Sequence, residues 1–260
     1  MDWLNALAGA LVGVLVGLTG VGGGSLMSPI LILLFGVAPA TAVGTDLWFA
    51  AITKTVGGAV HSHHDGADWQ VVRRLCLGSL PAALLTLLWL SMSGAQQEKS
   101  GLIVYALGAM LVLTGVVTPF RLTLARRFAL VHLDGTERYA HLQPVLTVLA
   151  GAVLGVLVTL TSVGAGALGA TLLLMLYPAR LTMKRLVGTD IIHAVPLTLL
   201  GGIGHLLIGN VDLALLGTLL IGSIPGIVLG SLLASRLSET IVRPVLALVL
   251  VAVGVKLMLV

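Results

Sequence analysis

The chain has 260 residues, of which 58% are hydrophobic and 9% charged, and its mean hydropathy is +1.12. This composition excludes a soluble globular domain and predicts an integral membrane protein, since most of the chain needs lipid as its solvent. The net charge of +4 does not indicate nucleic-acid binding, because the Lys and Arg residues lie in short loops between apolar segments and form no continuous stripe.

Apolar segments long enough for helices follow one another along the chain. A β-barrel would show alternating polarity, whereas the segment from Leu102 to Val117 is continuously apolar. We therefore expect an all-α, polytopic membrane protein, and we expect the first helix to stay in the mature protein because no positive charge precedes it. The predicted helices span residues 3–18, 25–36, 41–60, 72–92 and 100–118, and then 144–160, 167–177, 183–207, 211–234 and 240–259.

The second half of the chain repeats the first. At a shift of 144 residues, the tetrad from Val43 to Asp46 aligns with the identical tetrad from Val187 to Asp190. The same shift places Gly57, Gly58, His61, Asp68, Gly78, Ser79 and Pro81 on Gly201, Gly202, His205, Asp212, Gly222, Ser223 and Pro225. At a shift of 142, the residues Gly9, Gly13, Thr19 and Gly22 fall on Gly151, Gly155, Thr161 and Gly164. Internal repeats are typical of transporters, so we predict one transport domain over residues 1–260, with repeats over about 3–118 and 143–260 and a linker over about 119–142.

In each half the first two helices are short and meet at a break, Gly20 to Gly24 or Ser162 to Gly166. Each pair could be one kinked crossing, a re-entrant hairpin or two short crossings. Cytoplasmic loops are rich in Lys and Arg. If each pair returns to the side where it started, only Lys99 and Lys256 oppose eleven basic residues on the other side: Arg73, Arg74, Arg121, Arg126, Arg127, Arg138, Arg180, Lys184, Arg185, Arg236 and Arg243. We therefore predict the returning arrangement in the inner membrane, with both termini outside the cytoplasm, a cytoplasmic linker and two inverted repeats.

The two breaks are the predicted substrate site. Non-helical backbone inside a membrane must line protein or a water-filled cavity, and the helix N-termini that follow the breaks favour an anion. We expect binding by Thr19, Gly22, Gly23, Gly24 and Ser25 in the first break and by Thr161, Ser162, Gly164 and Gly166 in the second. The alternative is that the glycines allow close helix packing, which is the interpretation we favour for Gly9, Gly13, Gly17, Gly151 and Gly155.

Ionisable residues within apolar segments are costly and mark functional sites. With the adjacent threonines, they make a set of candidates for gating or ion coupling: Thr45, Asp46, Lys54, Thr189, Asp190 and His193. The two aspartates could instead cap helices, and His193 could be either a proton relay or a hydrogen-bonded helix residue. For His61 and His205 a structural or interfacial role is favoured over a metal site, because the second repeat offers only one such histidine.

Several of these motifs resemble the sulfite exporter TauE/SafE family, also called the 4-toluene sulfonate uptake permease family: the glycine-rich break, the repeated tetrad, the Gly-Gly pairs before His61 and His205, and the Gly-Ser-x-Pro motifs at Pro81 and Pro225. The resemblance covers nearly the whole chain. It implies gradient-coupled transport of sulfite, sulfoacetate, thiosulfate or a similar anion, and it supports roles for Gly22, Gly24, Thr45, Asp46, Thr189 and Asp190. The second break departs from the first by having Ala165 in place of Gly23.

We therefore predict a secondary transporter whose partners are a small anion, membrane lipid and a coupling proton or cation. An anion channel is the nearest alternative. A membrane-embedded enzyme is the more distant one, since the sequence has no convincing zinc or nucleophile arrangement. The sequence has no ATP-binding motif, and we expect no cofactor and no metal.

Overall fold

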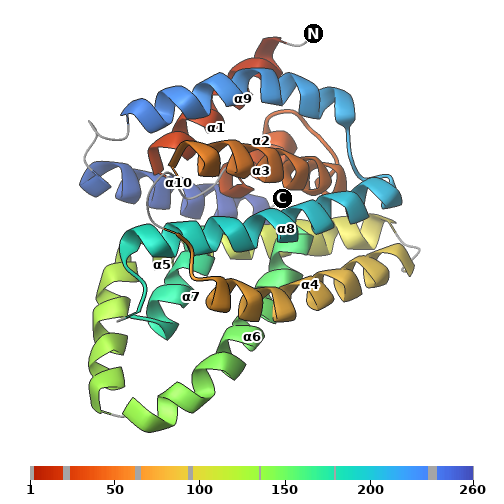
Figure 1. The fold of residues 1–260 in the computed structure, drawn as a ribbon. Coiled ribbons are helices and arrows are strands. Elements are labelled where there is room, and N and C mark those ends of the chain that lie inside the picture. The colour runs from red at the N-terminus through yellow and green to blue at the C-terminus, as the bar shows by residue number, and fades with distance from the viewer. Residues whose placement is uncertain are drawn as a thin grey trace.

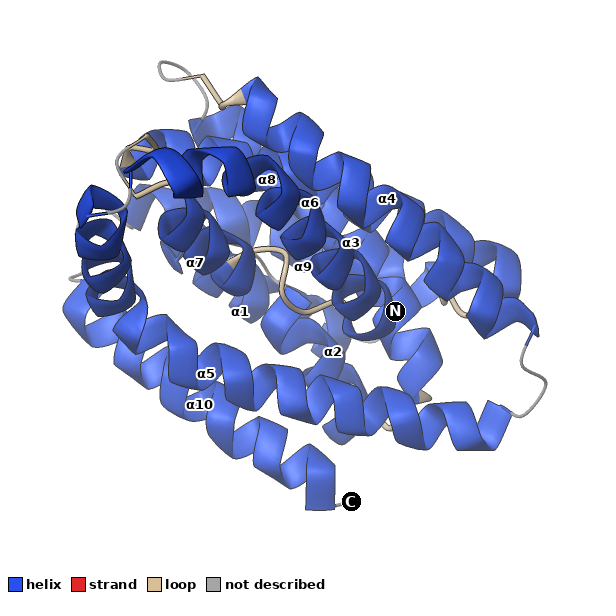
Figure 2. Cartoon of the chain, turned by 90° about the horizontal axis from the view of Figure 1, so that it is seen from below, coloured by secondary structure: helices blue, strands red, loops and turns tan. Residues whose placement is uncertain are grey.

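The computed structural model describes residues 3–19, 24–61, 66–92, 96–134, 136–178, 180–233 and 239–259. In these residues it contains ten α-helices and no strand, which confirms the all-α prediction (Figure 1 and Figure 2). The helices are α1 Trp3–Thr19, α2 Gly24–Leu33, α3 Pro39–His61, α4 Trp69–Met92, α5 Gln96–Asp134, α6 Thr136–Thr161, α7 Ala167–Leu176, α8 Met183–Ile208, α9 Leu213–Leu233 and α10 Glu239–Leu259.

Local sequence signals set both ends of α8. Thr182 precedes the helix, and its hydroxyl accepts a hydrogen bond from the N–H of Arg185 at 3.4 Å, as an N-cap side chain does. Gly209 follows the helix with a φ of 88°, a left-handed conformation that glycine adopts without steric cost. Local capping residues therefore account for both ends of the helix that carries Asp190.

The predicted linker is helical, and this differs from the predicted helix boundaries at 118 and 144. Helix α5 continues to Asp134 and α6 begins at Thr136. The residues involved include many good helix formers, mainly Leu, Ala and Arg. A hydropathy pattern marks where an apolar segment ends, and here the helical backbone continues beyond that point.

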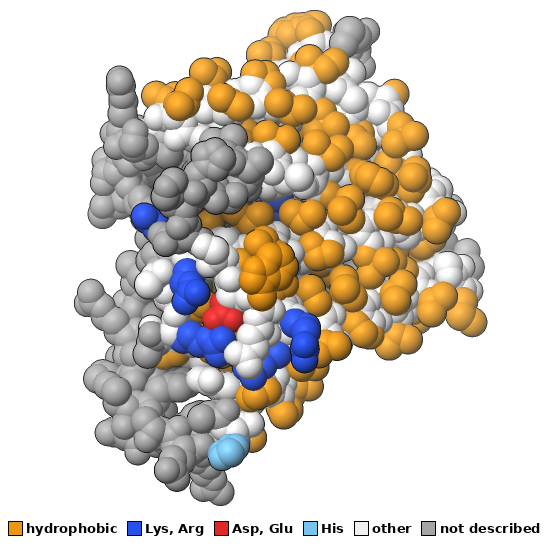
Figure 3. Space-filling model, in the orientation of Figure 1, with side chains coloured by type: hydrophobic (Ala, Val, Ile, Leu, Met, Phe, Trp, Pro, Cys, Tyr) orange, Lys and Arg blue, Asp and Glu red, His pale blue; other side chains and the backbone are white. Residues whose placement is uncertain are grey.

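Five described segments are long and apolar enough to cross a membrane: Trp69–Met92, Gly101–Phe120, His141–Thr161, Lys184–Ile208 and Leu213–Leu233. Large apolar side chains such as Leu11, Leu85 and Leu248 are exposed, and Figure 3 shows apolar side chains spread over much of one face. So extensive an apolar surface would be unfavourable in water and is suited to lipid. The chain is a multi-pass membrane protein.

The two halves pack against each other through contacts that follow the internal repeat. Helix α3 packs on its repeat counterpart α8, and α5 packs on its counterpart α10; α1 packs on α9, and their counterparts α6 and α4 pack on each other. Small residues permit these approaches. A Cβ on Gly13 would meet the backbone of Ser223, and a Cβ on its counterpart Gly155 would meet the backbone of Ser79. The prediction that these glycines allow close packing is confirmed.

Candidate functional site

The counterpart helices α3 and α8 carry four ionisable side chains into the interior, each at most 7% exposed: Asp46, Lys54, Asp190 and His193. Both aspartates lie seven residues beyond the first residue of their helices. A capping residue lies directly before the first turn, and in α8 that position belongs to Thr182. The alternative that Asp46 and Asp190 are helix caps is therefore wrong.

Asp46 is held from one side only. Ser28 of α2 donates to Oδ2 from its backbone N–H at 3.2 Å and from its hydroxyl at 2.5 Å. Ser162 lies close enough to interact with the same carboxyl, yet neither Ser162 Oγ nor Asp46 Oδ1 has a hydrogen-bond partner among the described residues. Buried polar atoms are nearly always paired with protein, water or ligand. Asp46 Oδ1 can therefore pair with a water molecule or a ligand.

Lys54 connects α3 to the second break. Its Nζ donates to the carbonyl oxygen of Ala165, and its charge interacts with Asp190 and with Asp46. Among the described side chains, neither carboxylate forms a direct ion pair with it. The ammonium of Lys54 is thus compensated by two buried carboxylates and not by a direct ion pair with one of them. A buried charge needs such compensation by opposite charges.

The second break is a buried turn between α6 and α7. Ser162 has a φ of 59° and Gly164 a φ of 117°; the carbonyl oxygen of Gly164 accepts from the N–H groups of Gly166 at 2.8 Å and Gly169 at 3.0 Å. The described hydrogen bonds of the Thr161 hydroxyl stay within its own turn, at Leu157 and Val163. The N-cap residue of α7, Gly166, makes no side-chain hydrogen bond, and the Asp190 carboxylate lies against Gly169 in the first turn of this helix, where the positive end of a helix favours a negative charge.

The first break can be located only in part. Gly22 and Gly23 lie outside the described residues, and Thr19, Gly24 and Ser25 belong to α1 and α2 without described side chains. Helices α2 and α7, which follow the two breaks, contribute apolar side chains to the same core cluster. An anion site between the two breaks therefore stays a prediction.

The histidines of α8 have different surroundings. His193 Nε2 lies 2.9 Å from Ser79 Oγ, while its Nδ1 has no partner in the described part of the chain. His205 Nε2 bonds to the carbonyl oxygen of Thr159 at 3.0 Å and ties α8 to α6, which fits a structural role; the side chain of His61 is outside the description. The described residues contain no group of three potential metal ligands.

Thr45 and Thr189 hold the loops that lead into α9 and α4. Thr189 Oγ1 accepts from the N–H of Asp68 at 3.0 Å, and Thr45 Oγ1 accepts from the N–H of Asp212 at 3.1 Å. Asp68 and Asp212 are repeat counterparts, and each carboxylate accepts from the N–H three residues later. The repeated tetrad therefore positions both loops. Sequence reasoning missed this role, although the Asp68 and Asp212 match was its signal.

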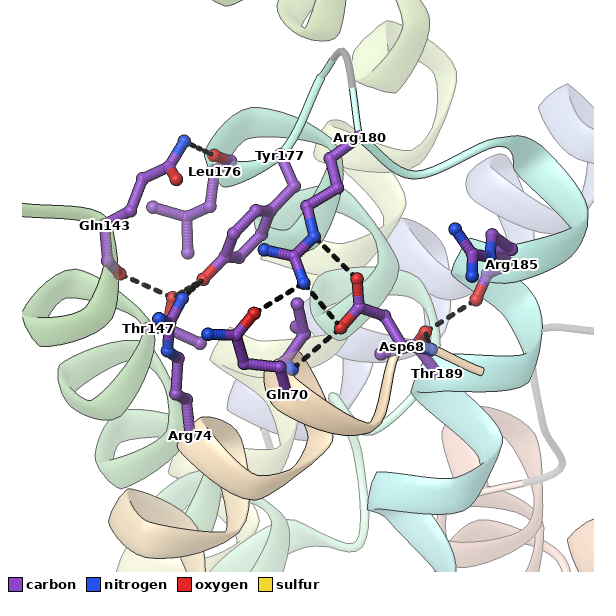
Figure 4. Close-up of polar contacts among 11 residues, drawn as sticks. Asp68, Gln70, Arg74, Gln143, Thr147, Leu176, Tyr177, Arg180, Arg185 and Thr189 are labelled. Atoms are coloured by element: carbon purple, nitrogen blue, oxygen red, sulfur yellow. Dashed lines mark hydrogen bonds and ion pairs between the residues drawn. The ribbon is translucent and has the colours of Figure 1, made fainter. Parts of the chain in front are cut away.

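An ion pair reinforces one of these two loops (Figure 4). Arg180 donates to Asp68 Oδ2 at 2.6 Å and to Oδ1 at 2.9 Å, and it also donates to Gln70 Oε1 at 2.7 Å. Burial alone would raise the pKa of the Asp68 carboxyl, but hydrogen bonds from Arg180 and from the N–H of Val71 outweigh it and hold the pKa below its ordinary value. The pair spans 112 residues of sequence, and no local pattern predicts it.

Tyr177 extends this network inward. Its hydroxyl lies 2.7 Å from Thr147 Oγ1 and accepts from Arg74 Nη1 at 3.0 Å, and its ring centre is 5.7 Å from the Arg180 guanidinium. Because Thr147 donates its own proton to the carbonyl oxygen of Gln143 at 2.6 Å, the Tyr177 proton is directed to Thr147. The starts of α4 and α8 and the N-terminal part of α6 are thereby joined.

Comparison with known proteins identifies the family. Residues 5–257 match the family described as "Sulfite exporter TauE/SafE". The chain belongs to the TauE/SafE family. One relative of this TauE/SafE chain, "Probable membrane transporter protein YjnA" of Bacillus subtilis (strain 168), is 39% identical over 257 residues, which cover 96% of this chain and 97% of the relative. Another, "Probable membrane transporter protein YdhB" of the same organism, is 29% identical over 210 residues, or 79% of each chain. No solved structure matches. The predicted family is confirmed, and this TauE/SafE member is a membrane transporter.

Proposed function

We propose that this TauE/SafE protein is a secondary transporter that moves a small sulfur-containing anion, such as sulfite, sulfoacetate or thiosulfate, with an ion gradient as its energy source. The observation that carries the proposal is the buried group of Lys54, Asp46 and Asp190 between the counterpart helices α3 and α8. Ionisable groups in such a position line the transport route of many membrane proteins. The family description, which names sulfite exporters, supports the substrate class.

The charges of this group suit an anion that travels with a coupling ion. Lys54 supplies a positive charge for the substrate, and the two carboxylates supply sites for a proton or another cation. Without a cation, two carboxylates beside one ammonium would repel an incoming anion. Binding of the coupling ion to Asp46 or Asp190 removes that repulsion, so binding of the two ions is linked.

The proposal includes the returning topology, with inverted repeats and both termini outside the cytoplasm. Its structural support is the ion pair of Asp68 and Arg180, which joins the starts of α4 and α8. If each broken pair crossed the membrane once, these starts would lie on opposite sides; if each pair returns, they lie on the same side. The contact between Thr45 and Asp212 likewise joins the starts of α3 and α9, as the returning arrangement requires at the other side.

Tracer flux into proteoliposomes tests the function. The purified protein is supplied with labelled sulfite, thiosulfate and sulfoacetate in turn, with and without a pH gradient. Saturable flux that responds to the gradient is expected; flux that rises in proportion to concentration would favour a channel. Lys54→Gln should lose the flux, whereas Lys256→Gln, which changes an exposed lysine of α10, should keep it. No flux of any sulfur anion would overturn the substrate class, and full flux in Lys54→Gln would overturn the central site.

A further inference from the structure

The internal repeat is broken by ionisable residues on the two central helices. Lys54 of α3 corresponds to Thr198 of α8, and His193 of α8 corresponds to Phe49 of α3. The nearby tetrad, by contrast, is identical in both halves. Residues that serve only to pack two similar halves should be similar in both. Burying one ionisable group on each helix destabilises the fold. Packing therefore does not explain why these two residues are present.

His193 is fixed at one ring nitrogen and unpaired at the other. Its Nε2 lies 2.9 Å from Ser79 Oγ of α4, and its Nδ1 has no partner among the residues that the structure describes, although the side chain is only 1% exposed. The charge of Lys54 acts on this imidazole. Ser223, the repeat counterpart of Ser79, is equally buried, but its hydroxyl has no hydrogen-bond partner among the described residues. Ser223 is thus a buried counterpart of Ser79 that forms no described hydrogen bond to a histidine.

The hydrogen bond to Ser79 sets which ring nitrogen of His193 can serve a ligand. When the Ser79 hydroxyl donates to Nε2, the neutral ring carries its proton on Nδ1. A buried N–H donor near an ammonium is the arrangement that an oxyanion needs, because charge-assisted hydrogen bonds are the strong ones.

We propose that His193 binds the transported anion by donating from Nδ1 to one of its oxygens, with Lys54 supplying the positive charge and Ser79 acting as a positioning residue for the imidazole. This inference rests on the proposed transport function and names the oxyanion as the chemical class recognised at the centre. The glycine breaks then shape the route, while discrimination between anions belongs to the centre of α3 and α8.

Two amide substitutions separate binding from structure. In His193→Asn the amide nitrogen can take the place of Nδ1, whereas in His193→Gln the amide reaches the place of Nε2 and can keep the contact with Ser79. If His193 binds the anion, His193→Gln should raise the KM for sulfite by roughly 10- to 100-fold, the cost of one hydrogen bond to a charged ligand. His193→Asn should raise it less, and both should keep a maximal flux near that of wild type. A purely structural histidine predicts the reverse order, with His193→Asn the more impaired and the less thermally stable.

The matched serines provide the control. Ser79→Ala should raise the KM for sulfite, because it frees the imidazole, and Ser223→Ala should leave it unchanged. Each variant is first checked for folding by size-exclusion chromatography, and binding is measured separately through thermal stabilisation by added sulfite. An unchanged KM in His193→Gln and Ser79→Ala, or equal effects of Ser79→Ala and Ser223→Ala, would overturn this inference while wild-type flux upholds the transport function. Absence of sulfur-anion flux in the wild type would overturn both.

Discussion

Loss of Arg180 should loosen the junction between the starts of α4 and α8. Arg180→Ala deletes two hydrogen bonds to Asp68, one to Gln70 and the contact with the Tyr177 ring. Asp68 is 8% exposed; it keeps the N–H of Val71 but loses its counter-charge. The variant therefore leaves a largely buried carboxylate only partly compensated.

The exposure of Arg180 limits the cost. Hydrogen bonds to charged groups contribute about 1.5–3 kcal/mol each, whereas exposed ion pairs contribute about 0–1 kcal/mol. Arg180 is 41% exposed, so water replaces part of what is lost, and we expect a decrease of about 1–2 kcal/mol in the free energy of unfolding. For a chain of this size, that decrease lowers the unfolding temperature by roughly 2–8 °C.

Thermal unfolding in detergent, followed by size-exclusion chromatography of heated samples, measures this shift. Arg73→Ala is the matched control, because Arg73 is exposed near the start of α4. This substitution removes a positive charge from the same end of the molecule as Arg180→Ala does. A carboxylate with a lowered pKa stabilises the fold above its ordinary pKa, and this contribution is lost as the pH falls through the lowered value. The difference between wild type and Arg180→Ala should therefore be full near neutral pH and shrink below about pH 4. Equal shifts in Arg180→Ala and Arg73→Ala, or a difference that ignores pH, would refute the reasoning.

Three further outcomes are expected. Gly13→Ala should destabilise the protein by about 1–3 kcal/mol, because its Cβ would overlap the backbone of α9; Gly217→Ala, which meets nothing within 4 Å, should be neutral or stabilising in the same unfolding assay. Tyr177→Phe removes the hydroxyl that bonds to α4 and α6 and should cost about 1 kcal/mol; an unfolding temperature equal to that of wild type would contradict this network. Reporter fusions at Met1 and Val260 should both give signals from outside the cytoplasm; cytoplasmic signals from both would overturn the topology.

The helical architecture could be predicted from the sequence because lipid imposes a simple rule on it. Each crossing needs a long apolar segment, and such segments are visible without any knowledge of contacts. The same rule explains the difference at the linker. The rule marks only where an apolar segment ends. Helix α5 continues past that point to Asp134, and helix α6 begins at Thr136, ahead of the next apolar segment.

The site was only partly predictable for a related reason. Asp46, Lys54, Asp190 and His193 stood out because charge is rare in apolar segments. Their partners did not stand out, since Ser28 and other small residues are equally common where membrane helices merely pack. The carbonyl oxygen that accepts from Lys54 belongs to an alanine, and no side-chain pattern can reveal a backbone acceptor.

The excluded capping role makes Asp46→Asn and Asp190→Asn sharper tests of ion coupling. Ser28 donates to Asp46 through an N–H and an O–H, and the carbonyl oxygen of an asparagine can accept both, so the local structure should survive. Because two carboxylates face one ammonium, each single variant leaves Lys54 with one counter-charge and should still fold. Loss of flux would therefore report the missing carboxylate itself.

We expect each Asn variant to lower flux by about tenfold or more, equivalent to roughly 1.4 kcal/mol in the transport barrier, and to flatten the response to a pH gradient. Asp212→Asn is the matched control, because within the described part of the chain the carboxylate of this exposed residue accepts only from the N–H of Leu215, and asparagine fills that role equally well. If Asp46→Asn and Asp190→Asn both kept the flux and the pH response of Asp212→Asn, the two carboxylates would serve only to compensate Lys54. The coupling ion would then have to bind outside the central group.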